Sequence, residues 1–70
     1  GPDQKEIEWA VRVVVADKKA ETAGRGAWTL DGKMIDVPVV KKCMEVIARA
    51  ELCGYDPRDL LDEWKDQEPE

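Results

Sequence analysis

The stretch from Thr29 to Asp36, Thr-Leu-Asp-Gly-Lys-Met-Ile-Asp, constrains the fold of this chain more than any other part. Asp31 and Gly32 are typical of a tight hairpin turn, because glycine adopts positive φ without strain. We expect extended residues before the turn and a return arm from Lys33 to Ile35. Arms of about three residues are too short to be stable alone, so the hairpin must lie on other elements.

Helices are expected on both sides of this hairpin. The first runs from Gln4 to Ala23, with Asp3 as its cap and Gly24 and Gly26 at its end. Its apolar residues recur at helical spacing and form one stripe: Ile7, Val11, Val14 and Val15, widened by Trp9 and Val13.

The second helix begins at Asp36, because aspartate is a preferred N-cap and Pro38 is tolerated in the first turn. Its expected apolar face consists of Val39, Val40, Cys43, Met44, Ile47, Ala50 and Leu52, and Gly54 stops it. A third helix starts with Asp56 as its cap and Pro57 at its first position. The apolar residues of this third helix are Leu60, Leu61 and Trp64.

The predicted fold class is mainly α, in the order helix, short β-hairpin, helix, helix. Gly1 and Pro2 are typical of a protease scar in an expressed fragment, so residues 1–2 are set aside and a longer parent protein is expected. Residues 3–66 form one domain. Residues 67–70 are an acidic tail that we expect to fray.

Size and charge exclude several classes of function. Seventy residues allow one small core and no deep pocket. A net charge of −5, with 11 basic residues scattered among 16 acidic ones, argues against binding to nucleic acid or to an anionic membrane surface. Cys43 and Cys53 are expected to be reduced structural thiols, which fits a cytoplasmic protein.

Catalysis without histidine leaves few options. The chain contains none, so imidazole supplies neither a metal ligand nor a base. It also lacks a phosphate-cradling glycine loop. Asp31 and Asp36 are five residues apart across a turn, which allows both to face one surface but is weak evidence for a catalytic pair. On pattern alone Asp36 is a helix cap and Asp31 a turn residue.

The segment from Gly24 to Val40, GRGAWTLDGKMIDVPVV, resembles the C-terminal signature of citrate lyase β-subunit-like enzymes, which include malyl-CoA, β-methylmalyl-CoA and citramalyl-CoA lyases. The resemblance runs from Glu6 to Ala50. It implies the C-terminal lid of a (β/α)8 barrel enzyme that cleaves 3-hydroxyacyl-CoA thioesters, such as malyl-CoA to acetyl-CoA and glyoxylate. The stretch 53–66 departs from the family pattern and leaves the acyl-CoA substrate open.

The resemblance also implies roles for residues and partners. Asp36 matches the acidic residue that transfers a proton at the acetyl-CoA methyl carbon in a neighbouring subunit. Gly32 would let the turn approach that subunit, and Lys33 would contact CoA phosphates. Mg²⁺ is expected on the barrel of the parent enzyme and not on this segment. The expected partners are the protein's own barrel, a neighbouring subunit of a homo-oligomer and the acyl-CoA, and the segment alone is expected to be inactive.

A second class of function is also compatible with the sequence. An acidic chain of three helices with three tryptophans is compatible with a small protein-interaction module that has no catalytic parent. A preceding stretch with eight βα units, typical of such barrels, would favour the lyase.

Overall fold

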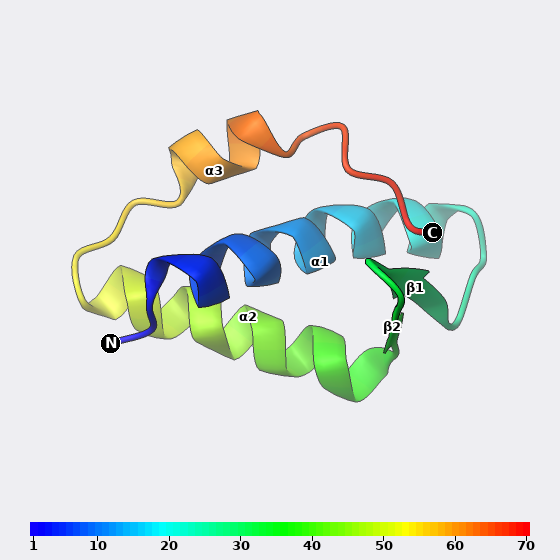
Figure 1. Cartoon of the computed structure of the whole chain (residues 1–70), viewed down its shortest axis with the longest axis horizontal. Helices are drawn as coiled ribbons and strands as arrows, with labels where there is room; N and C mark the ends of the chain where they lie inside the picture. Colours follow the sequence, from blue (N-terminus) through cyan, green and yellow to red (C-terminus); the bar gives the residue numbers. More distant parts are fainter.

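The computed structural model describes residues 1–70 and contains three helices and one hairpin, in the predicted order. The mainly helical layout is therefore confirmed. Helix α1 lies in the middle, with α2 on one side of it and α3 on the other (Figure 1). The elements are α1 (Gln4–Thr22), β1 (Trp28–Leu30), β2 (Lys33–Ile35), α2 (Val37–Leu52) and α3 (Arg58–Glu63).

Local hydrogen bonds set the helix boundaries. The Asp3 carboxylate accepts from the N–H of Glu6 at 2.8 Å, which confirms the predicted cap of α1. The N-cap of α3 is Pro57 and not the predicted Asp56. Asp56 still satisfies one free donor of the first turn, because its Oδ1 accepts from the N–H of Arg58 at 3.0 Å.

The core lies between α1 and α2 and is closed at one end by the hairpin. All of its side chains are apolar or thiol, and no charged residue is buried. None of the three helices combines the length and the hydrophobicity that crossing a bilayer demands. The buried residues are Ile7, Ala10, Val11, Val13, Ala16 and Ala20 of α1, Trp28, Leu30 and Ile35 of the hairpin, Val40, Cys43, Val46 and Ala50 of α2, and Leu60 of α3.

The predicted apolar stripe of α1 is partly wrong. Val14 and Val15 are only half-buried, whereas three alanines outside the predicted stripe are at most 1% exposed: Ala10, Ala16 and Ala20. The distance between packed helices depends on the side chains at their contact, so alanines there favour a close approach. The buried face of α1 therefore consists of small residues as well as valines.

The predicted face of α2 is also partly wrong. Met44 and Leu52 are 56% and 88% exposed, while Val46, which was not predicted, is buried. Val46 follows Val40 and Cys43 at three-residue steps and therefore shares their face of the helix. Cys43 is buried as expected, but Cys53 is an exposed free thiol and not a structural one.

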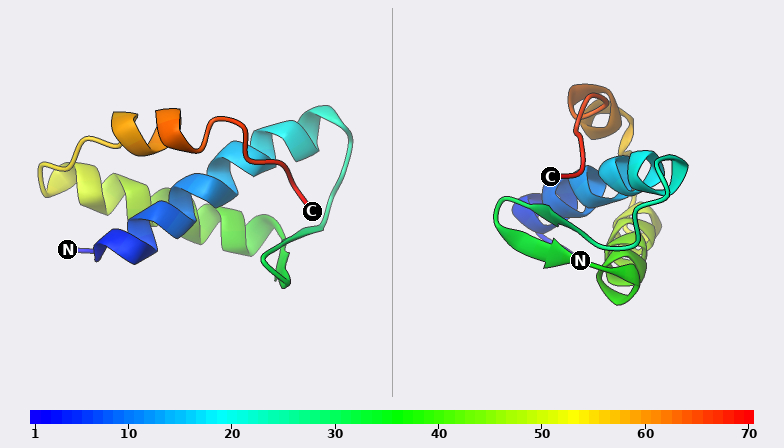
Figure 2. Two further views of the ribbon diagram at one scale, coloured as in Figure 1. Left: turned by 45° about the horizontal axis from the view of Figure 1, so that its top comes forward. Right: turned by 90° about the vertical axis from the view of Figure 1, so that its right-hand side faces the viewer.

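The acidic tail is ordered, which contradicts the expected fraying. The main-chain N–H of Glu70 donates to the carbonyl oxygen of Thr29 at 2.8 Å, and Lys19 Nζ donates to the carbonyl oxygen of Gln67 at 2.9 Å. Figure 2 shows the tail, in red, crossing α1 toward the hairpin. The tail therefore packs on the body of the molecule instead of extending into solvent.

Candidate functional site

The hairpin between α1 and α2 is built around a two-residue turn. Asp31 and Gly32 have φ angles of 50° and 79°, the pair of positive values that a type I′ turn requires. The predicted turn is therefore confirmed. A Cβ placed on Gly32 would meet nothing within 4 Å. Within this chain the glycine is thus required by its backbone angle and not by a close neighbour.

Arg12 of α1 holds the tip of the hairpin. Its Nη1 and Nη2 donate to the two carboxylate oxygens of Asp31 at 2.8 and 3.1 Å. The guanidinium also lies 4.6 Å from the ring centroid of Trp64, and its Nε donates to Gln67 Oε1 at 2.9 Å. The hydrogen bonds from Arg12 lower the pKa of Asp31, and the same bonds raise the pKa of Arg12. Asp31 is therefore more than a turn residue, because it ties the hairpin to α1.

Asp36 lies at the other end of β2, where the strand passes into α2. It is the N-cap of α2, as predicted: its Oδ1 accepts from the N–H of Val39 at 3.2 Å. The main-chain oxygen of Asp36 accepts from the N–H of Val40 at 3.0 Å. The side chain is exposed, and its second oxygen makes no hydrogen bond within the chain. One oxygen is thus fixed by the helix, and the other is available to another molecule.

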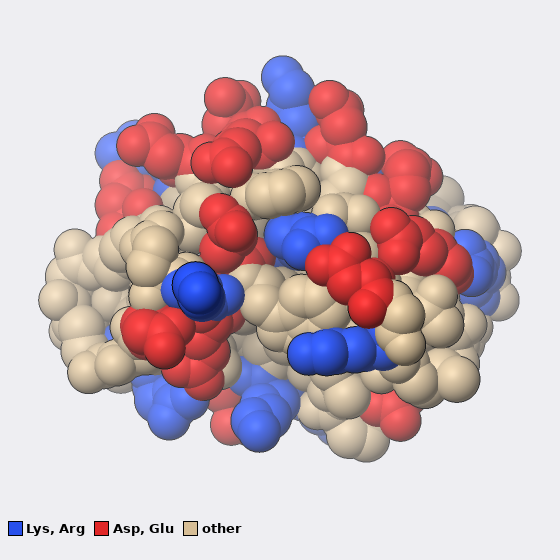
Figure 3. Space-filling model, in the orientation of Figure 1, with Lys and Arg blue, Asp and Glu red and all other residues tan.

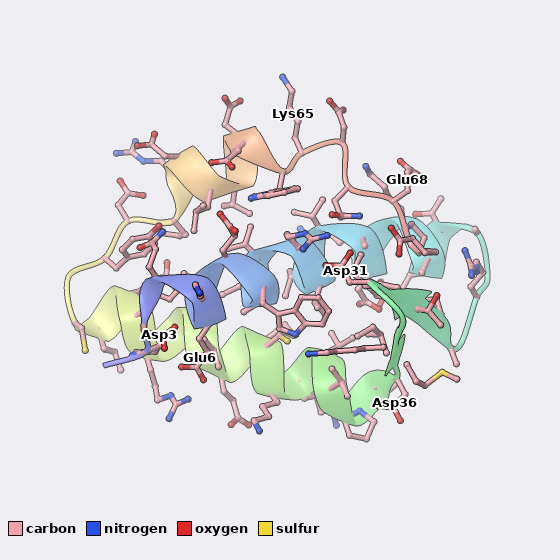
Figure 4. All side chains as sticks on the ribbon, viewed as in Figure 1. Asp3, Glu6, Asp31, Asp36, Lys65 and Glu68 are labelled. Carbon is pink, nitrogen blue, oxygen red and sulfur yellow. The ribbon has the colours of Figure 1, made fainter.

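Asp31 and Asp36 do not form a catalytic pair in this structure. They lie at opposite ends of β2, as Figure 4 shows. Gly32 of the turn and the three residues of β2 lie between them. Asp31 is also occupied by Arg12. Of the two, only Asp36 has a carboxylate oxygen without a partner in this chain.

Gly32 and Lys33, the predicted CoA-contacting residues, lie at the turn end of the hairpin and not beside Asp36. Lys33 Nζ lies 5.1 Å from the ring centroid of Trp9, a distance at which an ammonium is attracted to the aromatic face. The Lys33 side chain is exposed at this position. The structure does not gather these three residues around one pocket of this chain.

Three exposed apolar side chains lie on β2 and α2, the two elements that Asp36 joins, and the residue pattern did not single them out as a group. Met34 is 65% exposed, Val37 60% and Met44 56%. Val37 and Met44 also border a groove of about 380 Å³ between α1 and α2. The other residues that line the groove are Val14, Asp17, Lys18, Glu21, Arg25, Gly26, Val40 and Lys41.

The acidic residues of this chain do not form a metal site. No three carboxylate or thiol side chains converge where they could hold one ion. Mg²⁺ is usually bound by one or two carboxylates together with waters and substrate oxygens, in octahedral geometry.

Comparison with known proteins decides the family. Over 53 residues, 76% of this chain, the sequence is 47% identical to the β subunit of citrate lyase from Escherichia coli K12. The chain belongs to the citrate lyase β-like family. Two further relatives each match 70% of the chain: citrate lyase subunit β of Haemophilus influenzae at 43% identity, and human mitochondrial citramalyl-CoA lyase at 35%.

These relatives are much longer than the segment they share with this chain. The match spans 18% of the Escherichia coli protein, 17% of the Haemophilus protein and 14% of the human one. No family model and no solved structure matches the chain. This lyase-family chain therefore corresponds to a small part of its relatives, and the rest of their length has no counterpart in it.

Proposed function

We propose that this chain is the C-terminal lid of a CoA-ester lyase that reversibly cleaves a 3-hydroxyacyl-CoA, such as malyl-CoA, into acetyl-CoA and glyoxylate. The lid closes over the active site of an adjacent subunit of a homo-oligomer and completes it. The observation that carries this proposal is the position of Asp36, a carboxylate aimed outward at a helix start in a chain whose relatives are lyases.

Asp36 is suited to proton transfer at a carbon beside a thioester. Such a step needs a base held within hydrogen-bond reach of the proton. The bond from the Val39 N–H fixes one oxygen and so limits the directions of the other. In our proposal the free oxygen takes a proton from the acetyl-CoA methyl carbon in one direction of the reaction and returns it in the other.

The exposed apolar residues of β2 and α2 support a role as a lid. Met34, Val37 and Met44 present apolar surface to solvent on the hairpin and on α2. Grouped exposed apolar residues are typical of surfaces that another protein body covers. In our proposal they pack on the barrel, which brings Asp36 to the substrate and removes water from the site.

In our proposal Gly32 and Lys33 contact CoA. Lys33 is exposed and is held by an aromatic face instead of an ion pair, so its ammonium can turn to a phosphate. In this proposal Mg²⁺ is held by carboxylates of the barrel, as the family resemblance implies. The isolated chain is accordingly expected to be inactive. The two free thiols fit the cytoplasm as its location.

The alternative of an interaction module without a catalytic parent has less support. An interaction module would explain the exposed apolar residues equally well. The acidic composition of the chain, however, is not specific to interaction modules. The matches at 35–47% identity run to lyases and not to binding modules. The lyase proposal accounts for both the exposed apolar residues and the identity to lyases.

The proposal is tested by substituting Asp36 in a longer lyase polypeptide that includes this segment. Asp36→Asn keeps the cap, because asparagine also accepts the N–H bond, but removes the base. We expect kcat to fall by about 100-fold or more. KM for the CoA ester should change by no more than about twofold, since binding is not the function assigned to this residue.

A matched control separates the cap from the base. Asp3→Ala removes the corresponding cap of α1 and should lower stability by about 1 kcal/mol without affecting turnover. Equal turnover in wild type and Asp36→Asn would remove Asp36 from the mechanism.

A further inference from the structure

The outer edge of β1 is occupied by the chain's own tail. The N–H of Glu70 donates to the carbonyl oxygen of Thr29 at 2.8 Å, and the N–H of Thr29 donates to the main-chain oxygen of Glu70 at 3.3 Å. The Glu70 side chain accepts a further bond from the N–H of Asp31 at 2.9 Å. Glu70 therefore sits beside β1 as a neighbouring strand would, on the edge that β2 does not use.

Cations on and just after α1 hold the tail along its path to this edge. Lys19 Nζ donates to the carbonyl oxygen of Gln67 at 2.9 Å and lies 3.0 Å from Glu68 Oε2. Arg25 Nη2 donates to the main-chain oxygen of Glu70 at 2.7 Å. Gln67 also accepts from Arg12 Nε at 2.9 Å. Arg25 Nη1 also donates to the carbonyl oxygen of Pro69 at 3.5 Å, so the three cations together contact each of the last four residues.

The net charge of the molecule is concentrated in the segment that contains the tail. Residues 56–70 contain seven of the 16 acidic residues and two of the 11 basic ones, so this segment carries the whole net charge of −5. Residues 1–55 are neutral overall. In Figure 3 acidic side chains crowd the upper edge of the molecule, where α3 and the tail run. An acidic segment therefore lies across a nearly neutral body at a row of cations.

We propose that the outer edge of β1, together with Arg12, Lys19 and Arg25, is a binding site for an acidic, extended peptide, filled in cis by residues 66–70. Strand addition supplies the main-chain bonds, and Lys19 and the Asp31 N–H favour carboxylates at the positions of Glu68 and Glu70. A tethered peptide has a high effective concentration, which keeps the site filled from within the chain. This site is separate from Asp36 and does not depend on the proposed lyase activity.

The test compares two variants of the 70-residue chain that lose the same charge. Glu68→Ala with Glu70→Ala removes two tail carboxylates that contact the site. Asp59→Ala with Glu63→Ala removes two exposed carboxylates of α3 that make no such contact. Amide hydrogen exchange is then followed by NMR at Thr29 and Asp31.

We expect exchange at both amides to be about tenfold faster in the tail variant than in wild type, because bonds to charged groups are lost. The α3 variant should match wild type. Adding an acetylated and amidated peptide, Asp-Gln-Glu-Pro-Glu, to the tail variant should restore slow exchange in a saturable manner. The same peptide with Gln in place of each Glu should bind about tenfold more weakly.

Three results would overturn the proposal. Unchanged exchange in the tail variant would show that the tail does not occupy the edge. Equal acceleration in the α3 variant would show a general effect of charge. Protection in wild type that depends on protein concentration, with a dimer in sedimentation, would show that the tail of a second copy fills the site in place of the chain's own.

Discussion

Gly32 shows how one residue sets the conformation of the hairpin. Its φ of 79° is strained for any residue with a Cβ, while the space around it is open. Gly32→Ala should therefore lower the free energy of unfolding by about 1 kcal/mol through backbone strain alone. Urea denaturation followed by tryptophan fluorescence measures this loss.

Gly26 is the matched control for that substitution. It also has open space around its Cβ position but does not have a positive φ. Gly26→Ala should leave stability unchanged or raise it slightly, because it reduces the freedom of the unfolded chain. If both variants lost equal stability, the left-handed turn would not be the cause.

The Arg12–Asp31 pair makes stability depend on pH in a defined direction. The pKa of Asp31 is lower in the folded chain than in the unfolded one, so its contribution to stability is complete above the unfolded pKa of about 4. That contribution is lost as pH falls through the lower, folded pKa. Asp31→Asn should therefore have a lower urea midpoint than wild type at pH 6, and the difference should shrink below about pH 4.

Glu45→Gln serves as the control for that experiment, because the Glu45 side chain is exposed and, unlike that of Asp31, is not paired with a cation. Its midpoint should follow that of wild type at every pH. A difference between Asp31→Asn and wild type that stayed constant down to pH 2 would show that the lowered pKa of Asp31 does not contribute.

At the scale of elements, close packing of α1 on α2 depends on alanines. Ala16 is fully buried between its neighbours. Ala16→Leu should destabilise the chain by about 1–3 kcal/mol, because the added atoms have no space in the core. Ala48→Leu, on the exposed side of α2, should change stability by no more than about 0.5 kcal/mol. Similar losses in both variants would contradict this description of the core.

The same elements show which features can be predicted from sequence. The turn at Asp31 and Gly32 and the cap at Asp36 depend on contacts within a few residues, and both predictions were confirmed. The buried alanines of α1 were missed because the predicted stripe was based on the spacing of large apolar side chains. The exposure of Met44 was missed because both faces of α2 near it are apolar, and only the tertiary arrangement decides which one is buried.

The tail and the candidate site were harder to predict for a different reason. The bonds that join Thr29 to Glu70 link residues 41 apart, and nothing in the local pattern near either residue indicates them. Likewise, Asp31 was predicted only as a turn residue because its partner, Arg12, lies on another element. Asp36 was identified through a family resemblance, since its local pattern indicates only a cap.

At the scale of the whole molecule, the chain is a small body with the exposed carboxylate of Asp36 at one end, and its match spans 14–18% of the length of the relatives compared above. Its core is closed and apolar, and its acidic segment is held on the far side of α1 from α2 (Figure 1). The corner that carries Asp36 is the part with the exposed apolar residues Met34 and Val37. Our proposal requires that this corner meets the substrate of a larger assembly.

The most direct test of that claim is hydrogen exchange at the methyl group of acetyl-CoA. A longer lyase polypeptide that includes this segment is incubated with acetyl-CoA in D₂O, and deuterium incorporation is followed by NMR or mass spectrometry. If Asp36 is the base, the wild-type protein should incorporate deuterium. The rate of incorporation by Asp36→Asn should be at least about 100-fold lower. Equal incorporation by the two proteins would contradict the assignment of the base to Asp36.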